Sequence, residues 1–140
     1  MAEDAEPMKV THETKLSAAI DGTTTQIMLV LAEATRIASE KAKEHGFGIV
    51  GTCNTSTSTG ALGYYCKKVA DEGMIAICMA QSPEFVAPAG SSKAIFGTNP
   101  IGVGIPSAEG SMVLDMATSA YSWFGVLEAR DLSCCARVLS

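Results

Sequence analysis

The clearest pattern along the chain is helical and lies between residues 27 and 46. Apolar side chains recur there at spacings of three and four residues, which places them on one face of an amphipathic helix. Three threonines at positions 23–25 offer an N-cap, and Gly46 follows basic residues at the far end and offers a C-cap. The sequence therefore predicts a helix that ends at Gly46 and is buried through Ile27, Leu31, Ala34, Ile37, Ala38 and Ala42.

Short apolar runs on either side of a second helical segment predict strands. Residues 9–20 alternate loosely and lead into Asp21-Gly22, which indicates one strand and a turn. Residues 47–53 and 74–80 are short and apolar, so we expect two buried strands, with a helix over 60–72 between them. Because strand, helix and strand in this order are typical of a crossover unit, we expect these two strands to pair in parallel.

The second half of the chain predicts a long loop, two strands and a helix. Five prolines and glycines interrupt residues 81–100, and strands at 101–105 and 112–116 are joined by a turn at 106–111. A helix over 117–130 starts with Thr118 or Ser119 as its cap. The fold class is thus α/β, a mixed sheet with flanking helices over residues 9–130. Residues 1–8 form a disordered leader and residues 131–140 a tail without periodicity.

Composition narrows the class of protein. Hydrophobic residues make up 47% of the 140 and charged residues 18%, which excludes a disordered chain and leaves apolar surface for a partner. A net charge of −5 without a basic cluster argues against nucleic acid. No apolar run approaches the ~20 residues of a membrane span, and the start is acidic, so we expect a cytoplasmic protein. The five cysteines lack CxxC spacing and predict buried, reduced thiols, with no metal site.

One motif matches a dinucleotide fingerprint by its letters alone. Residues 46–51 read G-x-G-x-x-G, and Asp71 follows about 20 residues later. In that fingerprint the glycines follow a strand and open a helix whose N-terminus meets the pyrophosphate. Here they follow a predicted helix and begin a predicted strand. We therefore interpret them as a helix cap and a strand, and not as a Rossmann site.

Four segments, taken together, resemble the type-2 malate/L-lactate dehydrogenase family, which includes ureidoglycolate, diketogulonate and sulfolactate dehydrogenases. Their order and spacing follow the family over about Val10–Arg130. Family members are roughly twice as long or more, which makes this chain a central fragment, and a Ser-His-Gly motif with a catalytic histidine belongs to the part before it. The segments are KAKEHGFGIV, TGALGYYCKKVADEGMIAI, VAPAGSSKAIFGTNPIGVGIPS and VLDMATSAYSWFGVLEAR.

The resemblance implies a non-Rossmann nicotinamide-binding fold and an oxidoreductase. It implies NAD or NADP as cofactor, a small 2-hydroxy acid and its 2-keto acid as substrates, and a homodimer. Ser82 then corresponds to a residue that touches the dinucleotide, although an ordinary hydroxyl at a strand end is the alternative. The cofactor loop corresponds to Asp115, Met116, Ala117 and Thr118, for which the alternative is a capped entry into the last helix.

Ser58 departs from the family pattern, which commonly has a substrate-binding histidine at this position. A serine can hydrogen-bond a substrate oxygen but does not change charge near pH 7. The family's substrate position is thus altered, and a solvated loop that caps the next helix is the alternative. His45 suits the C-terminal end of its helix, and His12 receives no role. A catalytically inert chain that binds a dinucleotide or a full-length partner subunit is the second hypothesis.

Overall fold

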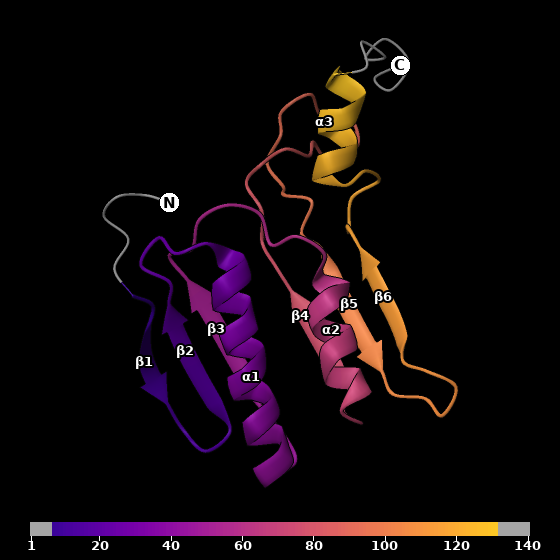
Figure 1. The fold of residues 1–140 in the computed structure, drawn as a ribbon. Helices are drawn as coiled ribbons and strands as arrows, with labels where there is room; N and C mark the ends of the chain where they lie inside the picture. The colour runs from indigo at the N-terminus through magenta and orange to yellow at the C-terminus, as the bar shows by residue number, and fades with distance from the viewer. Residues whose placement is uncertain (1–6, 132–140) are drawn as a thin grey trace.

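The protein folds into two three-stranded sheets, each covered by a helix (Figure 1). The structure is a computed structural model, and it describes residues 7–131. The strand orders are β1-β2-β3 and β4-β5-β6. The elements in chain order are β1 (Lys9–Glu13), β2 (Ser17–Asp21), α1 (Ile27–His45), β3 (Ile49–Cys53), α2 (Leu62–Asp71), β4 (Ala76–Met79), β5 (Ile101–Ile105), β6 (Met112–Met116) and α3 (Trp123–Asp131).

The first sheet begins with a hairpin where one strand was predicted. β1 and β2 pair antiparallel, and the turn between them is closed by the Thr14 N–H, which donates to the Ser17 carbonyl oxygen at 2.8 Å. The two hydroxyls of these residues also lie 2.8 Å apart. The turn contains neither glycine nor proline, so the usual breaker signal is absent from the sequence. The prediction of a single strand over residues 9–20 was wrong for this reason.

The parallel crossover unit is formed by β2, α1 and β3. β2 pairs with β3 in parallel from Ser17↔Ile49 to Asp21↔Cys53. The prediction that residues 47–53 and 74–80 pair with each other was wrong, because β3 and β4 belong to different sheets and β4 pairs antiparallel with β5. The order of strands and helices along the sequence was predicted correctly, but this order does not determine which two strands pair in a sheet.

Helix α1 packs its apolar face on the first sheet as the periodicity predicted. Ile27, Leu31, Ala34 and Ile37 are buried with Ile20 of β2, whereas Ala38 and Ala42 are half-buried. Each large aliphatic side chain buried there stabilises the fold by roughly 1.5–3 kcal/mol. The helix ends at Gly46, which adopts φ 81° and donates its N–H to the Ala42 carbonyl oxygen. The threonine cap was wrong: Gln26 holds the N-cap position and makes no side-chain cap bond.

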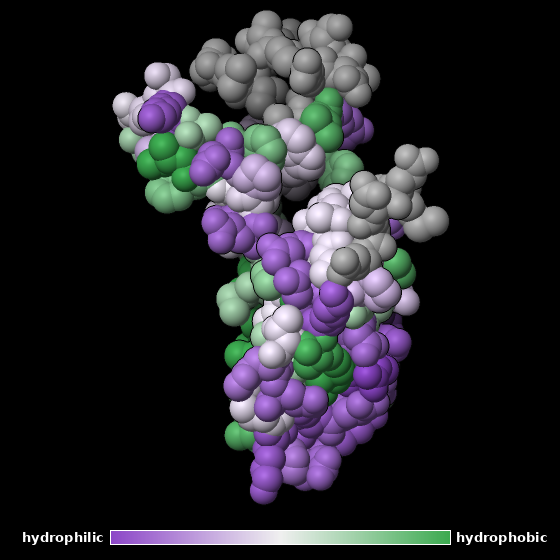
Figure 2. All heavy atoms as spheres, turned by 90° about the vertical axis from the view of Figure 1, so that its left-hand side faces the viewer, coloured by the Kyte–Doolittle hydropathy of each residue, from purple (hydrophilic) through white to green (hydrophobic). Residues whose placement is uncertain are grey.

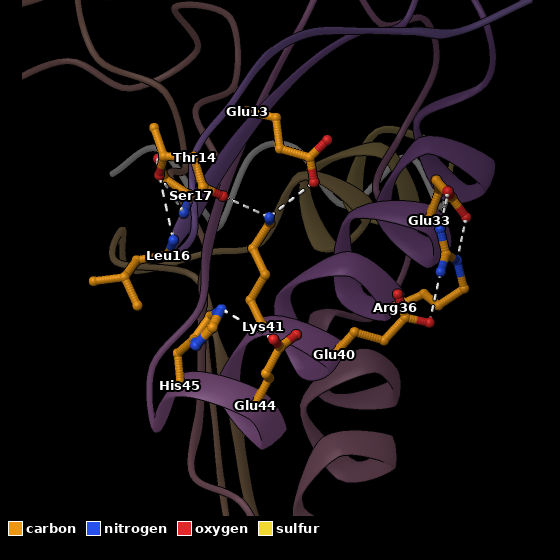
Figure 3. A network of polar contacts seen from close by, with 10 residues as sticks. All are labelled: Glu13, Thr14, Leu16, Ser17, Glu33, Arg36, Glu40, Lys41, Glu44 and His45. Atoms are coloured by element: carbon orange, nitrogen blue, oxygen red, sulfur yellow. Dashed lines mark hydrogen bonds and ion pairs between the residues drawn. The ribbon is translucent and has the colours of Figure 1, made fainter.

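A charged network ties α1 to the β1–β2 hairpin (Figure 3). The Lys41 ammonium donates to Glu13 Oε1 at 2.8 Å and to the Thr14 carbonyl oxygen at 2.7 Å. Only 12% of the Lys41 side chain is exposed, so its methylenes lie along the sheet while its charge reaches the hairpin. The hydrogen bond and the charge of Lys41 lower the pKa of the Glu13 carboxyl.

The second sheet approaches α2 closely because β5 carries glycine at the positions that face the helix. A Cβ on Gly104 would lie 2.3 Å from the Cys66 carbonyl oxygen, and one on Gly102 would lie 3.0 Å from Leu62 Cβ. Backbone of the helix thus rests on backbone of the strand, and any larger residue would push the two apart. The alternating glycines of the IGVGI strand are therefore a packing requirement.

Helix α3 begins later than the sequence suggested. It starts at Trp123, and the Gly125 N–H donates to Ser122 Oγ at 3.2 Å. Thr118 and Ser119 therefore do not cap this helix, and the prediction of a helix from residue 117 was wrong at its start. The Trp123 ring stacks on Phe85 with centroids 3.8 Å apart, whereas Tyr121 and Phe124 are exposed.

Several apolar strand positions predicted to be buried are exposed on the described part of the chain. Ile77 and Met79 of β4 are 66% and 73% exposed, because the described residues cover only one face of the second sheet, and Ile49 of β3 in the first sheet is 55% exposed. Cys53 is exposed as well, contrary to prediction, and Cys134 and Cys135 lie outside the described residues. By contrast, the side of the molecule where β1 lies outermost is mostly hydrophilic in its lower part (Figure 2).

Candidate functional site

The predicted cofactor residues gather at one edge of the second sheet. β4 and β6 are both antiparallel to β5, so they run in the same direction and end at the same edge. The segments after β4, before β5 and after β6 therefore meet there. They carry Ser82, Thr98 and Thr118, respectively, and α2 begins at the same edge (Figure 1).

Ser82 is held by a dense set of hydrogen bonds. Its hydroxyl oxygen accepts the N–H of Thr98 at 2.8 Å and that of Asn99 at 3.3 Å, and it lies 3.0 Å from Thr98 Oγ1. Its own N–H donates to Asn99 Oδ1 at 3.2 Å. A Cβ on Gly97 would lie 2.2 Å from the Ser82 carbonyl oxygen, so glycine is required beside it. The Ser82 hydroxyl thus organises the loop from within.

Ser82, Thr98 and Asn99 form a group that we call the Ser82 hub, and Thr118 is joined to it from the segment after β6. Its N–H donates to the Thr98 carbonyl oxygen at 2.9 Å, and its hydroxyl donates to that oxygen at 3.2 Å. Thr98 itself is 5% exposed and joins partners 16 and 20 residues away in the sequence. The glycines and prolines of residues 81–100 predicted a loop, and nothing in that pattern indicated the central role of Thr98. A polar residue between glycine and asparagine gave no sign of its burial.

Asp115 has a structural task that the sequence did not reveal. Its Oδ2 accepts the Gly63 N–H at 2.8 Å, at the start of α2, where Ala61 provides no side-chain cap. A carboxylate beside a helix N-terminus also interacts favourably with the helix dipole. The alternative reading of residues 115–118 as a capped entry into the last helix was wrong, because α3 begins only at Trp123 and Asp115 contacts the start of α2 instead. Met116 is exposed and Ala117 is half-buried next to it.

A hollow of about 430 Å³ opens beside the Ser82 hub. Ligand pockets commonly span about 300–1,000 Å³, so this hollow has room for part of a dinucleotide. Its wall carries the side-chain amides of Gln81 and Asn99 and the carboxylate of Glu84. These amide and carboxylate groups can hydrogen-bond ribose hydroxyls, and Ile95 and Phe96 add apolar surface. The lining residues are Gln81, Ser82, Pro83, Glu84, Ile95, Phe96, Gly97 and Asn99.

Ser58 lies in the exposed loop that leads into α2. Its hydroxyl oxygen accepts the Gly60 N–H at 3.3 Å, and Thr57 and Gly60 both adopt positive φ. Within residues 7–131, the recorded hydrogen bonds do not join Ser58 to the Ser82 hub. The predicted substrate residue therefore lies just before the end of α2 that Asp115 contacts, but within the described part of the chain it shares no hydrogen bond with the predicted cofactor residues.

The thiols beneath this edge are not prepared for nucleophilic chemistry. Burial raises the pKa of the Cys66 thiol, which lies on α2. Burial, with smaller contributions from Cys66 and Asp115, raises the pKa of Cys78 to about 11. Both groups are thus protonated at neutral pH and behave as small apolar side chains.

The described residues also contain no cluster of His, Cys, Asp and Glu that could hold a metal ion. No helix within residues 7–131 is long and apolar enough to cross a membrane.

Comparison with known proteins identifies the family of the chain. The model of the malate/L-lactate dehydrogenase family matches residues 1–133. The chain belongs to this family. Malate dehydrogenase of Pyrococcus abyssi is 41% identical over 112 residues, and L-sulfolactate dehydrogenase of Methanothermobacter thermautotrophicus is 38% identical over 120 residues. Ureidoglycolate dehydrogenase (NAD(+)) of Escherichia coli is 38% identical over 96 residues.

Solved structures of this family share the fold. Malate dehydrogenase of Pyrococcus horikoshii superposes with a TM-score of 0.81 at 40% identity, over 86% of this chain and 34% of its own. Malate dehydrogenase of Entamoeba histolytica gives 0.84 at 31% identity, over 90% and 35%. The curated relatives are covered to a similar extent, 31% and 35% for the two archaeal enzymes. This dehydrogenase-family chain thus spans about a third of the length of the relatives it matches.

Proposed function

We propose that the chain forms the cofactor-side part of an NAD- or NADP-dependent dehydrogenase that interconverts a small 2-hydroxy acid and its 2-keto acid. The observation that carries the proposal is the hub in which Thr98 joins Ser82 to Thr118 beside a ligand-sized hollow. A bound nicotinamide cofactor supplies the hydride donor or acceptor. Substrates of the malate or lactate type, a homodimer and a cytoplasmic location belong to the same proposal.

The residues divide into those that shape the site and those that face a ligand. Ser82 and Thr118 fix the loop through Thr98, and Asp115 anchors β6 to the start of α2. The cofactor then contacts the exposed groups next to them, namely Met116 and the amides of the hollow. A rigid loop of this kind positions a ring without further loss of conformational freedom on binding.

A chain that binds a dinucleotide or a full-length partner subunit without turnover is the second candidate. It is favoured by Ser58, which is exposed and has no imidazole to carry a proton at neutral pH. The two candidates share the cofactor site and differ in catalysis. Ser58→His restores the family residue at this position and tests whether its loss limits turnover.

Binding and turnover are measured separately. Calorimetric titration of NADH and NADPH measures binding, and energy transfer from Trp123 to the reduced nicotinamide shows that the two rings lie close together. Oxaloacetate or pyruvate is then added, and the absorbance of the reduced cofactor shows whether it is oxidised. We expect binding, weakened about tenfold in Ser82→Ala, which removes the acceptor of two loop N–H groups. Ser107→Ala is the matched control, because Ser107 Oγ accepts one loop N–H at the opposite edge of the sheet. Binding without turnover selects the second candidate. Absence of binding rejects the cofactor site in both candidates and leaves, of the second, only a chain that binds a full-length partner subunit.

A further inference from the structure

The hollow beside the Ser82 hub carries a negative charge that no positive charge in its wall offsets. Within the described part of the chain, its lining includes the carboxylate of Glu84 but no lysine, arginine or histidine. Lys93 lies in the same loop of the chain but does not line the hollow. The other polar side chains of the wall, Gln81, Ser82 and Asn99, are neutral. The charge of a ligand therefore matters at this place.

The backbone is held on both sides of Glu84. Before it, Ser82 is fixed in the hub through its own N–H and through its hydroxyl. After it, the Phe85 N–H donates to the Phe96 carbonyl oxygen at 2.8 Å, and the Phe85 ring stacks on Trp123 with centroids 3.8 Å apart. Because the neighbours of Glu84 are already ordered, a ligand that contacts its side chain orders few further groups on binding.

The Glu84 carboxylate itself is exposed and free to accept hydrogen bonds. Among the described residues, neither a hydrogen bond nor an ion pair joins it to another group. Other acidic side chains differ in this respect, since Glu13 pairs with Lys41 and Asp71 pairs with Lys67. An ionised carboxylate has two acceptor oxygens and no donor. It therefore binds ligand groups that donate, such as a pair of hydroxyls, and repels other anions.

The two nicotinamide cofactors differ at the adenosine ribose in this same property. In NAD the ribose carries neighbouring 2′- and 3′-hydroxyls, and both can donate to one carboxylate. In NADP the 2′-hydroxyl bears a phosphate, which presents acceptor oxygens and about −1.5 to −2 charges at neutral pH. In dinucleotide-binding domains of another fold, an acidic side chain at the 2′-hydroxyl accepts NAD, whereas an arginine admits the 2′-phosphate. The physical basis of that choice does not depend on the fold.

The position of the hollow suits the adenosine end of the cofactor, because the reacting end belongs beside the substrate. Hydride transfer requires the nicotinamide ring to lie against the reacting carbon. The predicted substrate residue Ser58 lies just before the end of α2 that Asp115 contacts, and neither residue lines the hollow. With the nicotinamide ring near Asp115 and Met116, the other end of the dinucleotide extends past Thr118 and Ser82 toward the hollow.

We propose that Glu84 determines the cofactor specificity of this chain: its carboxylate accepts the ribose hydroxyls of NAD and repels the 2′-phosphate of NADP. This inference rests on the proposed function, which leaves the choice between the two cofactors open. Like charges in contact at a partly exposed site, together with the lost hydrogen bond, weaken binding of NADPH relative to NADH by about tenfold or more. The chain is thus an NAD-preferring member of its family.

Calorimetric titration of NADH and of NADPH against the 140-residue protein and its variants tests the assignment. The unmodified protein should bind NADH about tenfold more tightly or better. Glu84→Gln keeps the length of the side chain but removes the charge, so NADH should bind more weakly, NADPH more tightly, and the ratio of the two Kd values should fall about tenfold. Glu109→Gln is the matched control, because it removes the same charge from an exposed glutamate at the opposite edge of the sheet and should leave the ratio unchanged.

Salt provides a second measurement on the unmodified protein. Dissolved ions screen the repulsion between the Glu84 carboxylate and the 2′-phosphate, but they affect hydrogen bonds to the ribose much less. The ratio of the NADPH and NADH Kd values should therefore fall as salt is raised from about 0.05 M to about 0.5 M. In Glu84→Gln the same ratio should change less with salt. Thermal melts show whether each variant is folded.

The possible outcomes separate this inference from the proposed function. If the unmodified protein binds both cofactors equally or prefers NADPH, the role of Glu84 is overturned and the proposed cofactor site stands. A preference for NADH that Glu84→Gln leaves intact, or that Glu109→Gln reduces as much, also overturns that role alone. Failure to bind either cofactor overturns the site and this inference together. If Glu84→Gln does not fold, a preference for NADH that does not respond to salt overturns the repulsion by Glu84.

Discussion

The bond between Asp115 and Gly63 gives the sharpest prediction about the architecture of the site. Asp115→Ala removes the carboxylate that accepts the Gly63 N–H at 2.8 Å and leaves a buried helix N-terminus without its cap. Loss of a cap costs about 0.5–2 kcal/mol, and a buried donor without acceptor costs about 1–3 kcal/mol. Because these two descriptions cover the same hydrogen bond, they do not add. We expect the free energy of unfolding to fall by about 1.5 kcal/mol.

Asp115→Asn distinguishes the hydrogen bond from the charge. The amide oxygen can still accept the Gly63 N–H, but the negative charge near the N-terminus of α2 is lost, which costs about 0.3–1 kcal/mol. Asparagine should therefore lie between alanine and the unmodified protein. Asp71→Ala is the control at the other end of the same helix, where the exposed carboxylate pairs with Lys67 and accepts the Ser111 hydroxyl at 2.7 Å. Because both contacts are exposed, it should change stability by less than about 1 kcal/mol.

Urea unfolding followed by circular dichroism measures these differences. With a slope of about 1.5 kcal/mol per molar urea, the expected loss for Asp115→Ala moves the midpoint by about 1 M. A midpoint unchanged within error would refute the capping role. Equal losses in the alanine and asparagine variants would show that the charge, and not the acceptor, stabilises this end of α2. Equal losses of unfolding free energy in Asp115→Ala and Asp71→Ala would mean that Asp115 stabilises α2 no more than an exposed carboxylate does.

Three further predictions concern packing, buried polarity and pH. Gly104→Ala should destabilise the fold by about 1–3 kcal/mol, because its Cβ would lie 2.3 Å from a backbone oxygen of α2. Gly51→Ala should not destabilise the fold, because a Cβ there would meet nothing within 4 Å, and thermal melts compare the two variants. Thr98→Val keeps the shape but removes the hydroxyl beside Ser82 Oγ, and should cost about 1 kcal/mol in the same melts. The pKa of Glu13 is lowered in the folded protein, so its contribution is present at neutral pH and is lost as the pH falls through the folded pKa. Melts at pH 7 and 3 should show Glu13→Gln closer to the unmodified protein at pH 3.

The contacts of the candidate site could be predicted only in part. Ser82 and Thr118 were identified from the family resemblance, and the structure connects both to Thr98. Thr98 escaped prediction because its role depends on bonds to residues far away in the sequence. The task of Asp115 was missed for the same reason, since the helix it caps starts more than fifty residues earlier. Local patterns report on local bonds, and these bonds are not local.

The sequence alone determined the positions of most elements and the ends that depend on their own residues. The periodicity of α1 and the left-handed Gly46 that ends it are local properties, as are the two strands around residues 106–111. The tertiary structure decided which strands pair: β3 pairs with β2, and β4 pairs with β5. It also decided how closely α2 packs on the second sheet, which depends on the glycines at 102 and 104. The physical reason is that every strand edge carries the same backbone groups, so the choice between edges falls to side-chain packing on the faces, which forms only when distant segments meet.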